Sequence, residues 1–114
     1  MTAGAPQPGG WKLVQFRDAL NNWRAHEHPT PARWEAVLRW MDARRTDPYE
    51  GCRRDPRIDN LWFAEIRGTA TVETVVVCSF RVNLARRELV CSNLATLSRP
   101  VTSGEWDPAW EPND

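Results

Sequence analysis

The fold of this chain is decided by residues 74–84, which read TVVVCSFRVNL. The segment is rich in β-branched residues, which fit a pleated and half-buried surface. Side chains along a strand alternate between two faces. The even-numbered residues from Val76 to Val82 therefore share one apolar face, while Ser79 and Arg81 lie on the other. We predict a strand here, with one buried face and one face that carries Arg81.

Further strand-like segments lie on both sides of this one along the chain. Residues 61–66 (LWFAEI) are closed by a turn at 67–69, and residues 88–97 follow through a short connection at 83–87. Strands joined by short turns pair antiparallel. Residues 11–16 (WKLVQF) either form a first strand or begin a helix, and we favour the strand. The sheet is thus expected to be antiparallel, with three or four strands.

Two helices are predicted before the sheet. The first covers residues 17–26. The second covers residues 31–46, because Thr30 is a good N-cap and Pro31 a favoured first helical residue. Its apolar side chains follow the i, i+3, i+4, i+7 spacing of one buried stripe, formed by Trp34, Val37, Leu38 and Met41. Breaker residues mark 47–60 as an irregular connector. The expected class is α+β, with two N-terminal helices packed on one face of the sheet.

Length and composition fit one domain. The chain has 114 residues, of which 41% are hydrophobic and 26% charged, and this length supports a core without metal or disulfides. We divide it into a flexible lead-in (1–10), a domain (11–100) and an acidic tail (101–114). No apolar stretch approaches the roughly 20 residues that a membrane span needs, and no signal peptide is recognised. A cytoplasmic protein with reduced thiols is expected, the thiols being Cys52, Cys78 and Cys91.

The distribution of charge says more than its sum, which is zero. From Glu105 onward there are four acidic residues and no basic one, so the rest of the chain has fifteen basic against eleven acidic residues, a net charge of +4. The strongest basic feature is the arginine group, defined as Arg44, Arg45, Arg53, Arg54 and Arg57. It would contact RNA phosphates without reading sequence. Interleaved acids leave open the alternative of a salt-bridged, solvated surface; they are Asp42, Asp47, Glu50, Asp55 and Asp59.

Seven tryptophans are many for this length. Four fit core positions, namely Trp11, Trp23, Trp34 and Trp62, and Trp40 is expected at the rim. Trp106 and Trp110 stand in the acidic tail. Bulky aromatics in a polar segment are typical of docking. One hypothesis is that the tail folds back on the domain, with Trp106 as the anchor and its acids facing the arginine group. The alternative is a disordered tail.

The order of elements, together with particular residues, resembles the RelE/ParE superfamily of bacterial toxins from toxin–antitoxin pairs. The resemblance covers residues 11–98. Its matching features are the opening WKLV at 11–14, the apolar stripe of the second helix, Asp47-Pro48, Leu61-Trp62 leading to Ile66-Arg67-Gly68, and the apolar strand 75–80. It implies a RelE-like fold with the order β-α-α-β-β-β.

The resemblance implies two kinds of activity. RelE-like members cleave messenger RNA within the ribosome, whereas ParE-like members act on DNA gyrase without nuclease chemistry, so fold does not settle function. RNA cleavage needs a base, a donor for the leaving oxygen and cations for the phosphate. By resemblance, Arg81 would clamp the phosphate and Glu65 would accept a proton. Arg67 would be an outer phosphate contact, and Arg99 would supply charge. Compensating charges on an exposed strand face are the alternative.

Some residues depart from the nuclease pattern. RelE-like nucleases usually carry Tyr or His after the final strand, where residues 95–99 here read ATLSR. Arg99 is a poor general acid because its pKa is too high. Tyr49 lies in the connector, and His26 and His28 end the first helix. No metal or cofactor is expected.

Three functions are therefore carried forward. The first is a toxin-type protein that inhibits translation as an mRNA endonuclease. The second is a non-catalytic protein-binding module on the same scaffold, and the third is an unrelated small α+β interaction protein of a mobile element. Whether the chain is an enzyme is left open. An antitoxin is the expected partner, with ribosome and mRNA or DNA gyrase as further candidates, and no membrane is expected.

Overall fold

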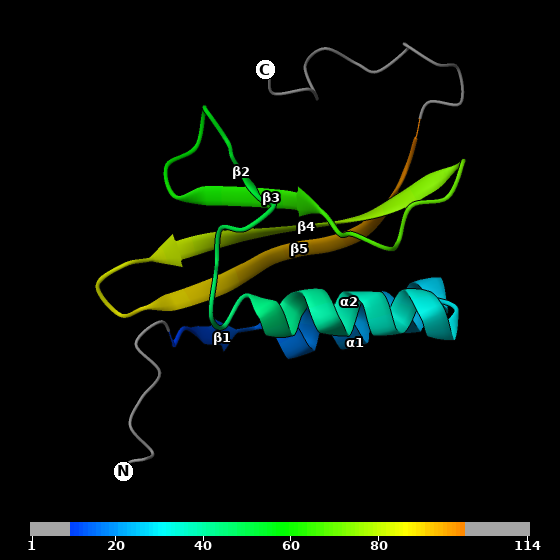
Figure 1. Ribbon diagram of the computed structural model, residues 1–114, viewed down its shortest axis with the longest axis horizontal. Helices are drawn as coiled ribbons and strands as arrows, with labels where there is room; N and C mark the ends of the chain where they lie inside the picture. The colour runs from blue at the N-terminus through cyan, green and yellow to red at the C-terminus, as the bar shows by residue number, and fades with distance from the viewer. Residues whose placement is uncertain (1–9, 100–114) are drawn as a thin grey trace.

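Two helices and five strands follow one another in residues 10–99, which are the residues that the computed structural model describes (Figure 1). Their bounds are β1 Lys12–Val14, α1 Phe16–Glu27, α2 Pro31–Ala43, β2 Arg53–Arg54, β3 Leu61–Glu65, β4 Thr74–Asn83 and β5 Glu88–Ser98. The α+β class and the two N-terminal helices are confirmed. Within the described residues, neither helix is long and apolar enough to cross a membrane.

The strands form one mixed sheet in the order β1-β5-β4-β3-β2. The three predicted C-terminal strands pair antiparallel, as expected. The prediction of a wholly antiparallel sheet with three or four strands is wrong in two respects. β1 pairs parallel with β5, and the two-residue β2 adds a fifth strand beside β3. β2 forms because the connector turns back at Asn60, whose φ is 62°, and Asp55 N donates to Leu61 O at 2.8 Å.

A β-bulge interrupts the pairing of β4 with β5 between Ser79 and Phe80. A bulge inserts an extra residue into one strand and changes which face the following side chains occupy. Leu89, Cys91 and Leu94 are therefore all buried in the helix-side core, although the last two are three residues apart. A strict period of two would have placed Leu94 on the other face.

The helix-side face of β4 is the centre of the core. The Phe80 ring is fully buried, and its centroid lies 6.3 Å from that of Phe16 on α1 and 6.2 Å from that of Trp40 on α2. Trp23 of α1 is also buried, and its Nε1–H donates to Thr96 Oγ1 at 2.9 Å. Trp40 was expected at the rim and is instead a core residue, because α2 turns it onto Phe80.

α2 begins as predicted, since Thr30 Oγ1 accepts a hydrogen bond from Arg33 N at 3.2 Å. It ends at Ala43 instead of residue 46, and a turn follows. Its buried stripe is shifted from the prediction: Leu38 is 38% exposed and Ala36 is buried. The turn after β3 packs closely here, because a Cβ added at Gly68, whose φ is 89°, would lie only 3.3 Å from Ala36 Cβ.

Candidate functional site: the open face of the sheet

The sheet has one face toward the helices and one that neither helix covers, which we call the open face. Residues that pair across strands lie on the same face, so the register assigns its members. They are Lys12 and Val14 on β1, Arg53 on β2, Leu61, Phe63 and Glu65 on β3, Val75, Val77, Ser79, Arg81 and Asn83 on β4, and Glu88, Val90, Asn93, Ala95 and Leu97 on β5. This face combines apolar side chains with five charged ones, namely Lys12, Arg53, Glu65, Arg81 and Glu88.

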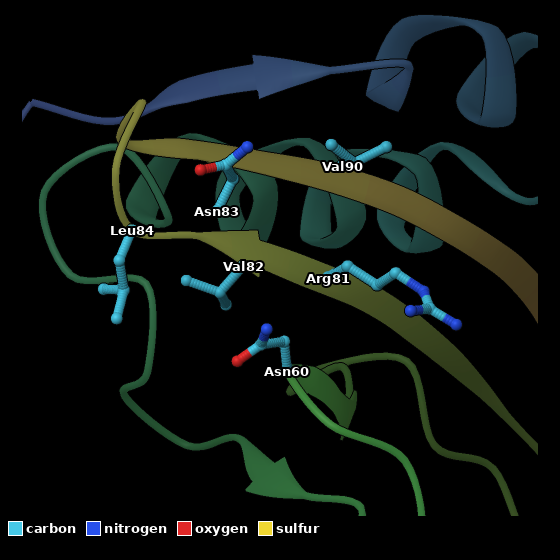
Figure 2. A pocket seen from close by; sticks show the side chains of 6 residues that line it. All are labelled: Asn60, Arg81, Val82, Asn83, Leu84 and Val90. Atoms are coloured by element: carbon cyan, nitrogen blue, oxygen red, sulfur yellow. The ribbon is translucent and has the colours of Figure 1, made fainter.

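Arg81 is exposed on this face, because its neighbours Phe80 and Val82 point into the core. Figure 2 shows its side chain extending along β4 with the helices behind the sheet. It borders an open hollow of about 510 Å³ that Asn60, Val82, Asn83, Leu84 and Val90 also line. Within residues 10–99, no carboxylate forms an ion pair with Arg81. The predicted placement of Arg81 is confirmed, and its role stays a prediction.

Glu65 lies on the same face but not near Arg81. It pairs with Val77, whereas Arg81 pairs with Leu61. Those two rows are four residues apart along the strands, a separation of about 13 Å at 3.3 Å per residue. A general base must come within hydrogen-bond reach of the proton it removes. Glu65 and Arg81 therefore do not converge on one scissile phosphate.

Arg99 lies at the opposite end of β4 from Arg81. Its backbone N donates to Glu73 O at 2.7 Å, and its Nη1 donates to Thr71 O at 3.0 Å. The adjoining pair of Thr74 with Ser98 lies seven residues from Arg81, or about 23 Å along the strand. Arg99 thus cannot share a phosphate with Arg81.

Arg67 lines a hollow with Glu65 and away from Arg81. It follows β3 in a turn, and its Nη2 lies 3.7 Å from Glu50 Oε2. Both residues line a separate hollow of about 260 Å³ between α2 and this turn, together with Arg39, Trp40 and Glu65. The four residues predicted for catalysis are therefore distributed over three places.

Arg44 is a structural residue, which removes it from the predicted RNA-binding surface. Its side chain is 1% exposed. Its Nε donates to Trp40 O at 3.1 Å and its Nη1 to Glu50 O at 2.7 Å, while the guanidinium lies 4.6 Å from the Trp40 ring centroid. The prediction that Arg44 contacts RNA phosphates is wrong, because the connector folds over α2 and encloses it.

Three other members of the arginine group form ion pairs with acidic residues close to them in sequence. The side chains of Arg45, Arg54 and Arg57 lie 3.3, 3.9 and 3.5 Å from Asp42, Asp59 and Asp55, respectively. Arg57 N also donates to Asp55 Oδ1 at 2.7 Å, and this bond holds the pKa of the Asp55 carboxyl below its usual range. Arg53 pairs in register with Phe63, which assigns it to the open face. These ion pairs favour the salt-bridged alternative.

The cysteines and histidines do not form a catalytic constellation within the described residues. Cys78 and Cys91 lie on neighbouring strands as predicted, with their Sγ atoms 3.8 Å apart in the core. Their hydrogen bond and burial raise the pKa of the Cys78 thiol well above its usual value. His26 Nδ1 lies 2.8 Å from Asn22 O, and His28 ends α1 in the left-handed conformation. No group of three metal-ligating side chains occurs in residues 10–99.

Sequence reasoning missed the asparagines beside Arg81. Asn60 lies in the left-handed turn before β3, and its carbonyl accepts from Val82 N at 3.0 Å. Asn83 ends β4, and its Oδ1 accepts from Arg86 N at 3.1 Å. Asparagine is favoured in such turns, so its position at each strand boundary was the available signal. The predicted docking residues Trp106 and Trp110 lie outside the described residues, as do residues 1–9 and the tail from 100.

Comparisons with known proteins assign no family to the chain. No family model matches the chain, and no match is found among curated proteins or among solved structures. The likeness to RelE/ParE toxins therefore rests on the sequence features described above.

Proposed function

We propose that this protein is a RelE/ParE-like, toxin-type protein that acts by binding a partner protein through its open face, not by cutting RNA. The observation that argues against RNA cleavage is the separation of Arg81 from Glu65, Arg67 and Arg99. A catalytic group must be positioned within hydrogen-bond reach of the reacting atoms. Residues about 13 Å and 23 Å apart along a rigid strand are not positioned for one reaction.

The chemistry around Arg81 suits an acidic and partly apolar segment. A guanidinium presents a planar fork that matches a carboxylate. Apolar contacts are available beside it, since Leu84 is 67% exposed and Val90 lines the same hollow. An extended partner segment that places a carboxylate on Arg81 and an aliphatic side chain on Leu84 would use both. The target protein whose inhibition arrests growth is expected to present a segment of this composition.

RNA cleavage is the competing function, and one observation favours it. Arg81 is exposed and has no ion pair within residues 10–99, so a phosphate could reach it. The described residues place no histidine or tyrosine beside it that could act as an acid or base; Tyr49 instead packs against Trp62, with ring centroids 4.5 Å apart. A cation alone positions a phosphate but does not transfer its protons.

Inducible expression in a bacterial host tests the proposal. The wild-type chain is compared with Arg81→Glu and with the control Arg39→Glu, which changes an exposed arginine on α2. We expect growth arrest from the wild type and the control, loss of arrest with Arg81→Glu, and intact messenger RNA by primer extension. Cleaved ribosome-bound messenger RNA would establish the nuclease instead. Normal growth with the wild type at high expression would remove the toxin assignment.

A further inference from the structure

Two thiols that the proposed function does not use meet across β4 and β5. Cys78 Sγ and Cys91 Sγ lie 3.8 Å apart, whereas a disulfide bond is about 2.05 Å long. Cys78 pairs in register with Leu94 and Cys91 with Phe80, so the β-bulge between Ser79 and Phe80 separates the two pairs. A bulge disrupts the ladder locally. The gap between the two sulfur atoms therefore falls where the pairing of the strands is already irregular.

The two thiols differ in how a reagent from solution can reach them. Cys78 is fully buried, whereas Cys91 is 6% exposed. Cys91 also lines an open hollow of about 390 Å³, which lies between the N-terminal half of α1 and β5. A small molecule that enters this hollow meets Cys91 first, and the sulfur of Cys78 lies behind it.

Their hydrogen bonds give the two thiols different acidities. A hydrogen bond from Cys78 and one from the backbone N–H of Asn93 hold the pKa of the Cys91 thiol below its usual value, against the effect of burial. The pKa of the Cys78 thiol is raised instead. Cys78 thus keeps its proton and donates it to Cys91 Sγ. The thiolate is the nucleophilic form of cysteine, so the more accessible thiol is also the more reactive one.

We propose that Cys91 and Cys78 form a two-cysteine oxidation site for a small hydroperoxide. The Cys91 thiolate attacks one peroxide oxygen, so that an S–O bond forms, the O–O bond breaks, and the other oxygen leaves and takes up a proton. Cys78 Sγ then attacks Cys91 Sγ, the S–O bond breaks, and the hydroxide leaves as water with the Cys78 proton. The two thiols lose two electrons and the peroxide gains them. Each chain reacts once, so this is a modification site.

The lining of the hollow favours an uncharged oxidant. It includes the carboxylate of Asp18 and the side-chain amides of Gln15, Asn22 and Asn93. Amides both donate and accept hydrogen bonds, which suits a hydroperoxide. The negative charge of Asp18 repels an anionic oxidant such as glutathione disulfide. The low exposure of Cys91 also favours the smaller molecule.

The test follows the oxidation of each thiol when the reduced full chain is mixed with hydrogen peroxide. Samples are alkylated and digested with trypsin, which places Cys52, Cys78 and Cys91 in separate peptides, residues 46–53, 68–81 and 88–114. We expect one disulfide between the last two peptides and an intact mass lower by two hydrogen atoms. Cys52, whose thiol pKa is raised by burial, should react at least about tenfold more slowly. Equal rates at all three thiols would mean oxidation of the unfolded chain and would overturn the site.

Three variants separate the roles of the two thiols. In Cys78→Ala, oxidation should stop at the sulfenic acid of Cys91, which dimedone traps. In Cys91→Ala, the thiol of Cys78 should stay reduced, and the matched control Cys52→Ser should still form the disulfide. A dimedone adduct that persists in the wild type, with no disulfide, would overturn the role of Cys78. If a variant with a changed core cysteine does not fold, the products and rates of the wild type decide the question alone.

The class of oxidant is tested with glutathione disulfide at the same concentration as the peroxide. We expect its reaction with Cys91 to be at least about tenfold slower. Asp18→Asn should speed this reaction while changing the rate with hydrogen peroxide by less than about twofold. A faster reaction of the wild type with glutathione disulfide than with peroxide would overturn the assignment to hydroperoxides. None of these readouts depends on growth arrest, so they stand apart from the test of the proposed function.

Discussion

The two faces of β4 differ in what their side chains do. From Val76 to Val82, the even-numbered residues are all buried against the helices. The other face changes along its length, from the buried Val75 to the exposed Arg81. One strand thus carries a uniform core on one side and a graded surface on the other. The comparison teaches that the helix-side face of β4 is buried throughout, whereas its open face is buried at Val75 and Val77 and exposed at Arg81.

The largest expected difference is in the free energy of unfolding, between variants of two neighbouring residues of β4. Phe80→Ala should lower the free energy of unfolding by about 3–5 kcal/mol, because it leaves a cavity between Phe16 and Trp40. Arg81→Ala should change it by less than about 0.5 kcal/mol, as expected for an exposed residue. Urea denaturation measures both. A comparable loss in the two variants would break the distinction between the faces.

Arg44 and Arg45 extend the comparison to adjacent arginines. Arg44→Ala should cost about 1–3 kcal/mol for each buried carbonyl that it leaves unsatisfied, and the carbonyls of Trp40 and Glu50 are its acceptors. Arg45→Ala removes a surface ion pair with Asp42, which is worth about 0–1 kcal/mol. Urea denaturation at low and high salt should show that only the small Arg45 effect is screened. Equal costs would place Arg44 at the surface.

A single hydrogen bond tests how α1 is fixed to β5. Trp23→Phe should destabilise the protein by more than about 1 kcal/mol, because the bond from Trp23 Nε1 to Thr96 Oγ1 is lost and the smaller buried ring leaves a cavity. Thr96→Val removes the acceptor. In a double-mutant cycle the two losses should be less than additive. Strict additivity would show that the bond contributes nothing to the free energy of unfolding.

The smallest effect is a dependence on pH. Burial raises the pKa of the Cys52 thiol, opposed by the nearby Arg44 guanidinium. The unfolded chain has an ordinary thiol pKa of about 8.5. The contribution of this group is fully present below that pH and decreases as pH rises through the folded pKa. The stability of the wild type relative to Cys52→Ala should thus fall between pH 7.5 and pH 10 in urea denaturation. A rise would contradict the direction of the shift.

Local sequence signals predicted a helix start and a strand correctly, because the residues that carry these signals have a well-defined effect on the backbone nearby. Thr30 and Pro31 fixed the start of α2, and the β-branched run fixed β4. The alternation of polar and apolar residues also predicted that Arg81 faces away from the core. These features depend on neighbours within a few residues, which a linear pattern contains.

Features that depend on distant parts of the chain were not predicted. A short apolar strand such as β1 shows no preference for a parallel or antiparallel partner, so its pairing with β5 was not foreseen. Arg44 looked like a surface residue because its enclosure requires the connector to fold over it. The separation of Glu65 from Arg81 follows from the strand register, which sequence periodicity alone does not give.

The position of β5 has a consequence for how the protein is made. It lies between β4 and β1, which comes before every other described element along the chain. Contacts between residues far apart in sequence slow folding. Until the ribosome has released Glu88–Ser98, the sheet has a gap between β1 and β4, and Leu13, Phe16 and Trp23 have no β5 to pack against. A translation product truncated before Glu88 should therefore be an aggregation-prone substrate for chaperones and proteases.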